Sequence, residues 1–121
     1  MKSDKALVRQ ATDQFKAQMA RHKSSILRQN EATVQRKQEI REISTRIRNQ
    51  RQGLKLVKEQ IGISEDLLRD NLTNRFRHLD LLKEAHKLSS SIETDNAALP
   101  RAQSAWKEAK AELLNMRSIF D

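Results

Sequence analysis

The sequence predicts an all-α protein folded as a long antiparallel coiled-coil helical hairpin. Its 121 residues include two Gly, one Pro and no Cys, so the strongest helix breakers are nearly absent. Hydrophobic residues make up 36% of the chain and charged residues 33%, which leaves too little apolar surface for a thick globular core. The apolar residues recur at spacings of three and four in two stretches, which a group of turn-forming residues separates.

The first helix is predicted over about residues 4–69 and carries one strong apolar row. Coiled coils need an apolar residue about every 3.5 positions. Steps of seven along the stronger row meet an apolar residue at seven of eight positions, whereas the weaker row has three of eight. The stronger row is Met19, Ile26, Thr33, Ile40, Ile47, Leu54, Ile61 and Leu68, and the weaker row is Phe15, His22, Gln29, Arg36, Ile43, Gln50, Val57 and Ser64. This contrast predicts a thin two-helix contact.

A turn is predicted at about residues 70–74, the densest group of turn formers in the chain. Asn71 can adopt the left-handed conformation that ends a helix. Thr73 or Asn74 can cap the next helix by accepting hydrogen bonds from its free backbone amides. The chain therefore reverses once, near residue 71.

A reversal at residue 71 pairs positions whose numbers sum to about 142, which places Leu88 near Leu54. At 1.5 Å per residue, the first helix would extend roughly 90 Å and the second roughly 70 Å. Val8 and Phe15 then overhang, unless another chain covers them. The sequence leaves open whether the seam closes within one chain or between two chains.

The second helix is predicted over about residues 75–120, where apolar residues alternate in steps of four and three. Eleven of twelve positions are apolar: Leu81, Ala85, Leu88, Ile92, Asp95, Leu99, Ala102, Trp106, Ala109, Leu113, Met116 and Phe120, with Asp95 the exception. Pro100 falls inside this stripe without disturbing its spacing. Because proline lacks an amide hydrogen and crowds the carbonyl group of Asn96, we expect one helix that is kinked near Pro100.

Charge is distributed unevenly along the chain. Residues 1–58 carry 15 basic and 5 acidic groups, and residues 59–121 carry 9 basic and 11 acidic groups. A basic half is compatible with nucleic-acid binding, but several of its arginines alternate with glutamates and glutamines, and no aromatic residue lies between Phe15 and Phe76 to stack on a base. A solvated helix face is the better interpretation, and we expect no nucleic-acid partner.

The sequence does not predict an enzyme. Two long helices offer no cavity in which catalytic groups converge. His78 and His86 are interpreted as surface residues without a third metal ligand, and no glycine-rich phosphate loop or Ser, His and Asp grouping is present. We expect no catalytic residue, cofactor, metal or small-molecule substrate. No apolar run exceeds three residues, so no segment is expected to span a bilayer.

The predicted turn gathers apolar and hydrogen-bonding residues at the end of the hairpin. We call them the tip cluster, and its members are Leu68, Arg69, Asn71, Leu72, Thr73 and Arg75. The end of a hairpin is the part that its own packing leaves free, and loops so placed commonly bind partners. The tip cluster is therefore the candidate partner-binding site, and a merely solvated turn is the equal alternative.

One part of the chain carries a family resemblance: residues 59–73, followed by Leu79, Leu81, Leu82 and the run Ser89, Ser90, Ser91 and Ile92. This part resembles the periplasmic adaptors of type I secretion, the haemolysin D type of membrane fusion protein. The resemblance covers roughly residues 30–121. It implies a hairpin, repeated in a ring of copies, that stands between an inner-membrane ABC transporter and a TolC-like outer-membrane duct. It also implies a periplasmic protein anchored in the inner membrane.

Tips in that family often combine an Arg, a Leu and a Ser or Thr. Leu68 and Thr73 match the last two members, but Ser64 stands where the arginine belongs, which leaves open whether Arg69 or Arg75 replaces it. The family's lipoyl and β-barrel domains are absent from the sequence, so we expect a hairpin fragment of a longer protein. Two alternatives stay open: a cytoplasmic coiled-coil stalk or chaperone of a type III export ATPase, and a basic nucleic-acid-binding coiled coil.

Overall fold

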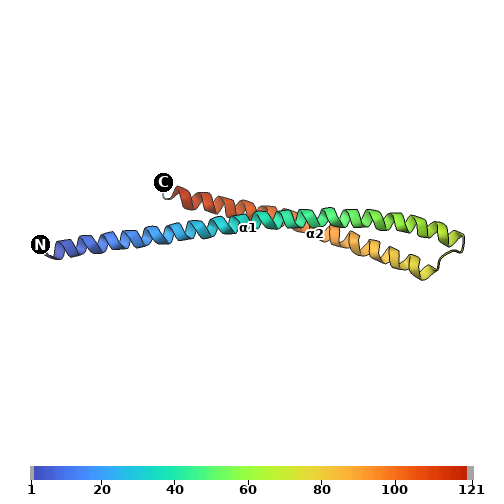
Figure 1. The fold of residues 1–121 in the computed structure, drawn as a ribbon. Coiled ribbons are helices and arrows are strands. Elements are labelled where there is room, and N and C mark those ends of the chain that lie inside the picture. The colour runs from blue at the N-terminus through green and yellow to red at the C-terminus, as the bar shows by residue number, and fades with distance from the viewer. Residues whose placement is uncertain (1, 120–121) are drawn as a thin grey trace. The chain divides into compact units, whose positions relative to one another are not determined.

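The computed structural model describes residues 2–119 and consists of two helices joined by a short turn. Helix α1 spans Lys2–Arg69 and helix α2 spans Arg75–Ser118. The two helices pack against each other as a hairpin within one chain, which confirms the predicted all-α fold (Figure 1). The chain divides into two compact units. We call residues Gln38–Ser104, which include the turn, the turn unit, and residues 2–37 with 105–119 the terminal unit.

Helix pairing in the turn unit follows the predicted alignment. His78 Nδ1 lies 2.9 Å from Ser64 Oγ, and these residue numbers sum to 142. A Cβ atom added to Gly53 would lie 3.7 Å from Leu88 Cδ1, in agreement with the expected neighbourhood of Leu88 and Leu54. In the turn unit, residues of α1 and α2 whose numbers sum to about 142 therefore lie side by side.

Both predicted rows of α1 lie on the seam of the turn unit. Ile47 in the stronger row and Val57 in the weaker row are 6% and 5% exposed. Ser64 in the weaker row is also buried, as is Asp95 on α2. At Ser64 the weaker row thus contributes a buried polar group in place of an apolar one. The contact is narrow, so few apolar side chains of the described residues are buried.

The terminal unit pairs the first part of α1 with the last part of α2. Gln29 Nε2 donates a hydrogen bond to the carbonyl oxygen of Ala109 at 3.0 Å. The Lys37 ammonium lies 4.2 Å from the ring centroid of Trp106, which is half-buried on the seam. Phe15 is 61% exposed, as an overhanging α1 predicts. The last member of the α2 stripe, Phe120, lies outside the described residues.

The turn between the helices is closed by backbone hydrogen bonds of the Schellman type. The amide of Leu72 donates to the carbonyl oxygen of Leu67 at 2.8 Å, and the amide of Asn71 donates to that of Leu68 at 3.1 Å. Asn71 has φ 56°, the only non-glycine residue with positive φ among residues 2–119. The prediction of a left-handed Asn71 is therefore confirmed.

Helix α2 begins with a side-chain cap. Asn74 Oδ1 accepts a hydrogen bond of 2.8 Å from the amide of Arg77, its third helical residue. Of the two predicted caps, Asn74 and Thr73, the structure therefore uses Asn74. Farther along, α2 continues through Pro100 as one helix, and Pro100 is exposed. Water can therefore bind the carbonyl group that the proline leaves without a donor.

Candidate functional site

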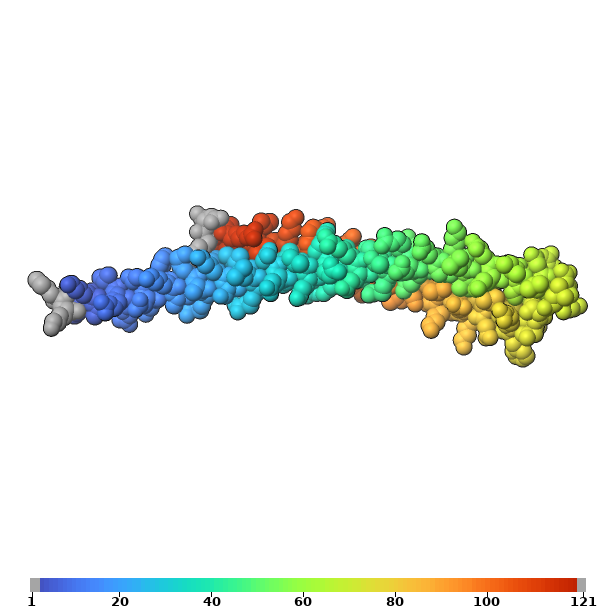
Figure 2. Space-filling model, in the orientation of Figure 1, coloured from blue at the N-terminus to red at the C-terminus, as the bar shows by residue number. Residues whose placement is uncertain are grey.

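The tip cluster forms the free end of the turn unit. Figure 2 shows the end of α1, the turn and the start of α2 in yellow-green, with no other segment of the turn unit over them in this view. Leu72 is 70% exposed, and its backbone is fixed by the turn bonds. The other members divide into the exposed Arg69, Asn71 and Arg75 and the half-buried Leu68 and Thr73. The structure thus brings together the predicted residues, and Leu72 is the most exposed apolar member of the cluster.

A residue outside the predicted cluster adds to this surface. Phe76, the second residue of α2, is 81% exposed, the largest exposed fraction among the large hydrophobic residues described. Its position five residues before Leu81, off the three-four spacing of the α2 stripe, places it on the face opposite the seam. That spacing was available from the sequence and identifies Phe76 as an exposed aromatic residue.

The two arginines of the cluster differ in their surroundings. The guanidinium group of Arg69 is hydrogen-bonded to the carboxylate of Asp66, one turn earlier on α1. Arg75 is the first residue of α2 and is exposed. Among the described side chains, none forms an ion pair with Arg75. Its guanidinium group is therefore available to an acidic or carbonyl-bearing partner.

A small groove of about 150 Å³ adjoins the turn. Ile63, Leu67 and Leu81 provide apolar walls, and Thr73 and Arg77 provide polar edges. Thr73 thus connects the exposed turn with the space between the helices.

The start of the seam below the tip contains a polar pair. Ser64 is 5% exposed and its hydroxyl group bonds to the imidazole of His78, which is half-buried. The interpretation of His78 as a surface residue was therefore wrong. Its spacing of seven residues from Ala85 places it on the α2 seam and could have revealed this. Ser64 is enclosed, so it takes no part in the exposed tip surface.

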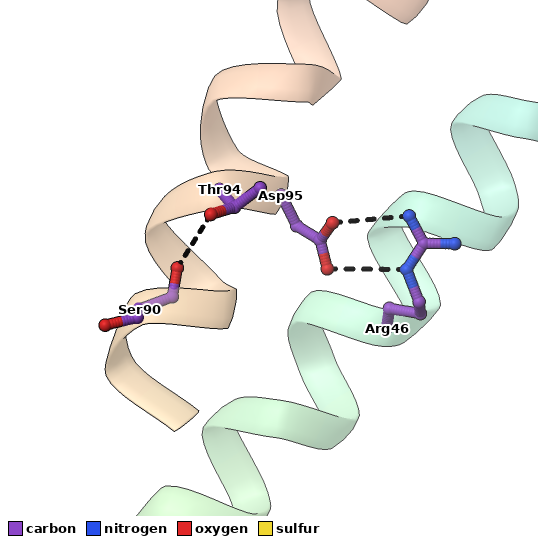
Figure 3. Close-up of polar contacts among 4 residues, drawn as sticks. All are labelled: Arg46, Ser90, Thr94 and Asp95. Atoms are coloured by element: carbon purple, nitrogen blue, oxygen red, sulfur yellow. Dashed lines mark hydrogen bonds and ion pairs between the residues drawn. The ribbon is translucent and has the colours of Figure 1, made fainter. Parts of the chain in front are cut away.

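A second buried polar group occupies the middle of the turn unit. Arg46 on α1 donates two hydrogen bonds to the carboxylate of Asp95 on α2, with Nε–Oδ2 and Nη2–Oδ1 distances of 3.4 and 3.3 Å (Figure 3). The hydrogen bond from Arg46 lowers the pKa of Asp95, and the same bond raises the pKa of Arg46. Thr94, the residue before Asp95, donates a hydrogen bond from Oγ1 to the carbonyl oxygen of Ser90, one turn earlier, at 3.0 Å. Asp95, the one polar residue in the apolar stripe of α2, is thus bound by Arg46 of α1.

The sequence that folds into these two long helices and one short turn matches a known family of protein domains. The family model described as AprE, long alpha-helical hairpin, matches residues 1–120. The chain belongs to this family. The AprE hairpins are those of type I secretion adaptors, which confirms the resemblance drawn from the sequence. Neither a curated protein nor a solved structure matched the chain significantly.

Membership of the AprE hairpin family gives the chain a structural, adaptor role. Within residues 2–119, neither α1 nor α2 contains a stretch apolar and long enough to cross a bilayer.

Proposed function

We propose that this hairpin belongs to a periplasmic adaptor that links an inner-membrane ABC transporter to a TolC-like outer-membrane duct in type I protein secretion. In this proposal the protein is anchored in the inner membrane, acts as a homo-oligomer, and docks on the duct through the tip cluster. The AprE family supports the adaptor role. The observation that carries the docking site is the exposed Leu72, held in a fixed turn beside a free arginine.

The proposed contact combines an apolar anchor with polar groups at its edge. Leu72 would enter an apolar recess of the duct, because removing its exposed apolar side chain from water is favourable. Arg75 would supply the family's arginine role, since Arg69 is already engaged by Asp66. Thr73 would supply the hydroxyl group. This arrangement favours a duct surface with an apolar recess bordered by carboxylate or carbonyl oxygens.

Secretion in cells that carry the transporter and the duct tests this proposal. We expect Leu72→Ser to lower export of the cargo by about tenfold, because the loss of a buried anchor costs binding free energy. The matched control is Leu27→Ser, a leucine of α1 in the terminal unit that is 65% exposed. This control should export normally. Far-ultraviolet circular dichroism should show unchanged helicity in both variants.

Two further variants sharpen the assignment of the tip arginine. We expect Arg75→Ala to reduce export more than Arg69→Ala does.

Normal export by the double variant Leu72→Ser, Thr73→Ala would count heavily against docking through the tip cluster. Normal secretion after loss of the whole adaptor would count against the adaptor function itself.

A further inference from the structure

One exposed side of α1 in the turn unit carries a row of cations. Arg41, Arg48 and Lys55 are seven residues apart, so they lie on one side of the helix. Arg51 and Lys58 follow Arg48 and Lys55 by three residues and form an adjacent row. We call these five exposed residues the basic stripe, and they extend along roughly 26 Å of helix.

The basic stripe has no acidic partner within the part of the chain that the structure describes, because none of its members forms an ion pair there. Glu39 and Glu42 lie seven and four residues before Arg46, so they share the side of α1 that carries Arg46. Residues two apart do not share a side, so this acidic side is not that of Arg48. Glu59, one turn after Lys55, marks the end of the stripe nearest the turn.

The cations of the stripe repel one another. Arg48, Arg51, Lys55 and Lys58 follow each other at spacings of three and four residues, which makes each consecutive pair neighbours on the helix surface. Like charges at these spacings destabilise a helix. Arg51, Lys55 and Lys58 also line one shallow groove. An anionic partner lying along the stripe would therefore relieve a repulsion that the described side chains leave uncompensated.

The surroundings of the stripe favour an acidic polypeptide over other polyanions. Helix α1 has no aromatic residue after Phe15, so the stripe offers no ring to stack on a nucleic-acid base. Its neutral neighbours Ser44 and Gln52 are polar, whereas a helix that binds an anionic bilayer carries an apolar side next to its cations. Carboxylates suit the bidentate geometry of arginine. At about 3.4 Å per residue, about eight extended residues would reach from Arg41 to Lys58.

We propose that the basic stripe binds an acidic, extended segment of the secreted polypeptide. The carboxylates of this segment would face the cations of the stripe while its backbone runs along α1. The assignment to the secreted polypeptide rests on the proposed function, because an adaptor between transporter and duct stands beside the path of the cargo. The binding of an acidic segment rests on the charges of the stripe alone.

Fluorescence anisotropy with the purified 121-residue chain tests the binding. The probe is a labelled polyglutamate long enough to span the stripe, which its own charges keep extended. The stripe variant is Arg48→Glu, Lys55→Glu. The matched control, Arg9→Glu, Lys16→Glu, reverses two exposed cations of α1 that are also seven residues apart and gives the same net charge.

We expect the control to bind polyglutamate like wild type and the stripe variant to bind about tenfold more weakly, because each reversal replaces an attraction with a repulsion. Polyglutamate should also raise the melting temperature of wild type more than that of the stripe variant. Circular dichroism should show unchanged helicity in both variants. If the reversal lowers helicity, the neutral variant Arg48→Gln, Lys55→Gln should show the same ranking against Arg9→Gln, Lys16→Gln.

Other outcomes overturn the proposal. Equal losses in the stripe variant and the control would show that net charge alone attracts polyglutamate. Tighter binding of a single-stranded oligonucleotide than of polyglutamate, abolished in the stripe variant, would show a nucleic-acid surface. The same result with vesicles of anionic lipid would show a membrane surface. Self-association that the stripe variant alone abolishes would show that a second copy covers the stripe.

Photocrosslinking in secreting cells tests the assignment to the cargo, and the absence of cysteine from the chain allows a single labelled site. Ser44→Cys carries the crosslinker three residues after Arg41 and four before Arg48. The control Thr12→Cys stands in the same relation to Arg9 and Lys16. We expect about tenfold more crosslinked cargo from Ser44→Cys, because contact raises the effective concentration of the two groups.

Equal yields of crosslinked cargo from the two sites would overturn the assignment to the secreted polypeptide. The anisotropy assay contains neither duct nor transporter. Its failure therefore leaves docking of the tip cluster untouched, and a failure of docking leaves the affinity for polyglutamate unchanged.

Discussion

The carboxylate of Asp95 on α2 accepts two hydrogen bonds from the guanidinium group of Arg46 on α1. Asp95 interrupts the apolar stripe of α2 and is 9% exposed, whereas the Arg46 side chain is 55% exposed. A carboxylate enclosed in a seam destabilises any alignment in which it lacks a partner. The pair therefore selects one alignment of the two helices, since a shift by one turn would separate the two charges.

The Asp95 pair predicts how stability changes with pH. The pKa of Asp95 is lowered from its ordinary value of 3.8, chiefly by the hydrogen bond from Arg46. The ionised carboxylate therefore stabilises the fold above pH 3.8, and this contribution is lost as the pH falls through the lowered folded-state pKa. We expect wild type to melt at a higher temperature than Asp95→Asn at neutral pH, and the difference to shrink in strong acid. Circular dichroism melts of both proteins between neutral and strongly acidic pH measure this, and a constant difference would contradict it.

Ile47 should contribute more to stability than an exposed isoleucine of the same helix. Ile47 is 6% exposed and Ile63 is 61% exposed. We expect Ile47→Ala to lower the free energy of unfolding by about 2 kcal/mol, the small end of the usual range, because the seam is narrow. The matched variant Ile63→Ala should change it by less than about 0.5 kcal/mol. Urea titrations at low protein concentration measure both, and equal losses would mean that Ile47 is not a core residue.

Asn71 should tolerate glycine but not a β-branched residue. Its φ of 56° lies in the left-handed region, which glycine adopts freely and most L-residues adopt at a cost of about 1 kcal/mol or more. We expect Asn71→Gly to retain wild-type stability and Asn71→Val to lose about 1 kcal/mol or more in urea unfolding. An equal loss in both variants would show that the Asn71 side chain, rather than its left-handed backbone, maintains the turn.

Asn74 and Thr73 should differ as helix caps. Asn74 Oδ1 accepts the hydrogen bond from the Arg77 amide, so Asn74→Ala should destabilise the hairpin by about 1 kcal/mol. Thr73→Ala removes no capping bond and should cost clearly less. Chemical denaturation of the two variants ranks them. An equal loss would indicate that Thr73 supports the turn through its contacts in the adjoining groove.

Much of the tip could be predicted because it depends on local chemistry. The turn follows from a cluster of residues that favour turns, and the left-handed Asn71 follows from the small polar side chain that this conformation tolerates. The exposure of Phe76 follows from helical spacing alone. The engagement of Arg69 by Asp66 could not be predicted, because the long arginine side chain has several partners within reach and its rotamer decides among them.

The sequence by itself determined the helices, the single reversal and the approximate heights at which α1 meets α2 in the turn unit. These features depend on periodicity and on short-range turn chemistry, which repeat along the chain and reinforce one another. The tertiary structure alone decided which polar residues of the seam become partners. Ser64 binds His78 and Arg46 binds Asp95 only when both helices are aligned and their side chains turn inward. Such pairings join residues far apart in the chain, so no local pattern specifies them.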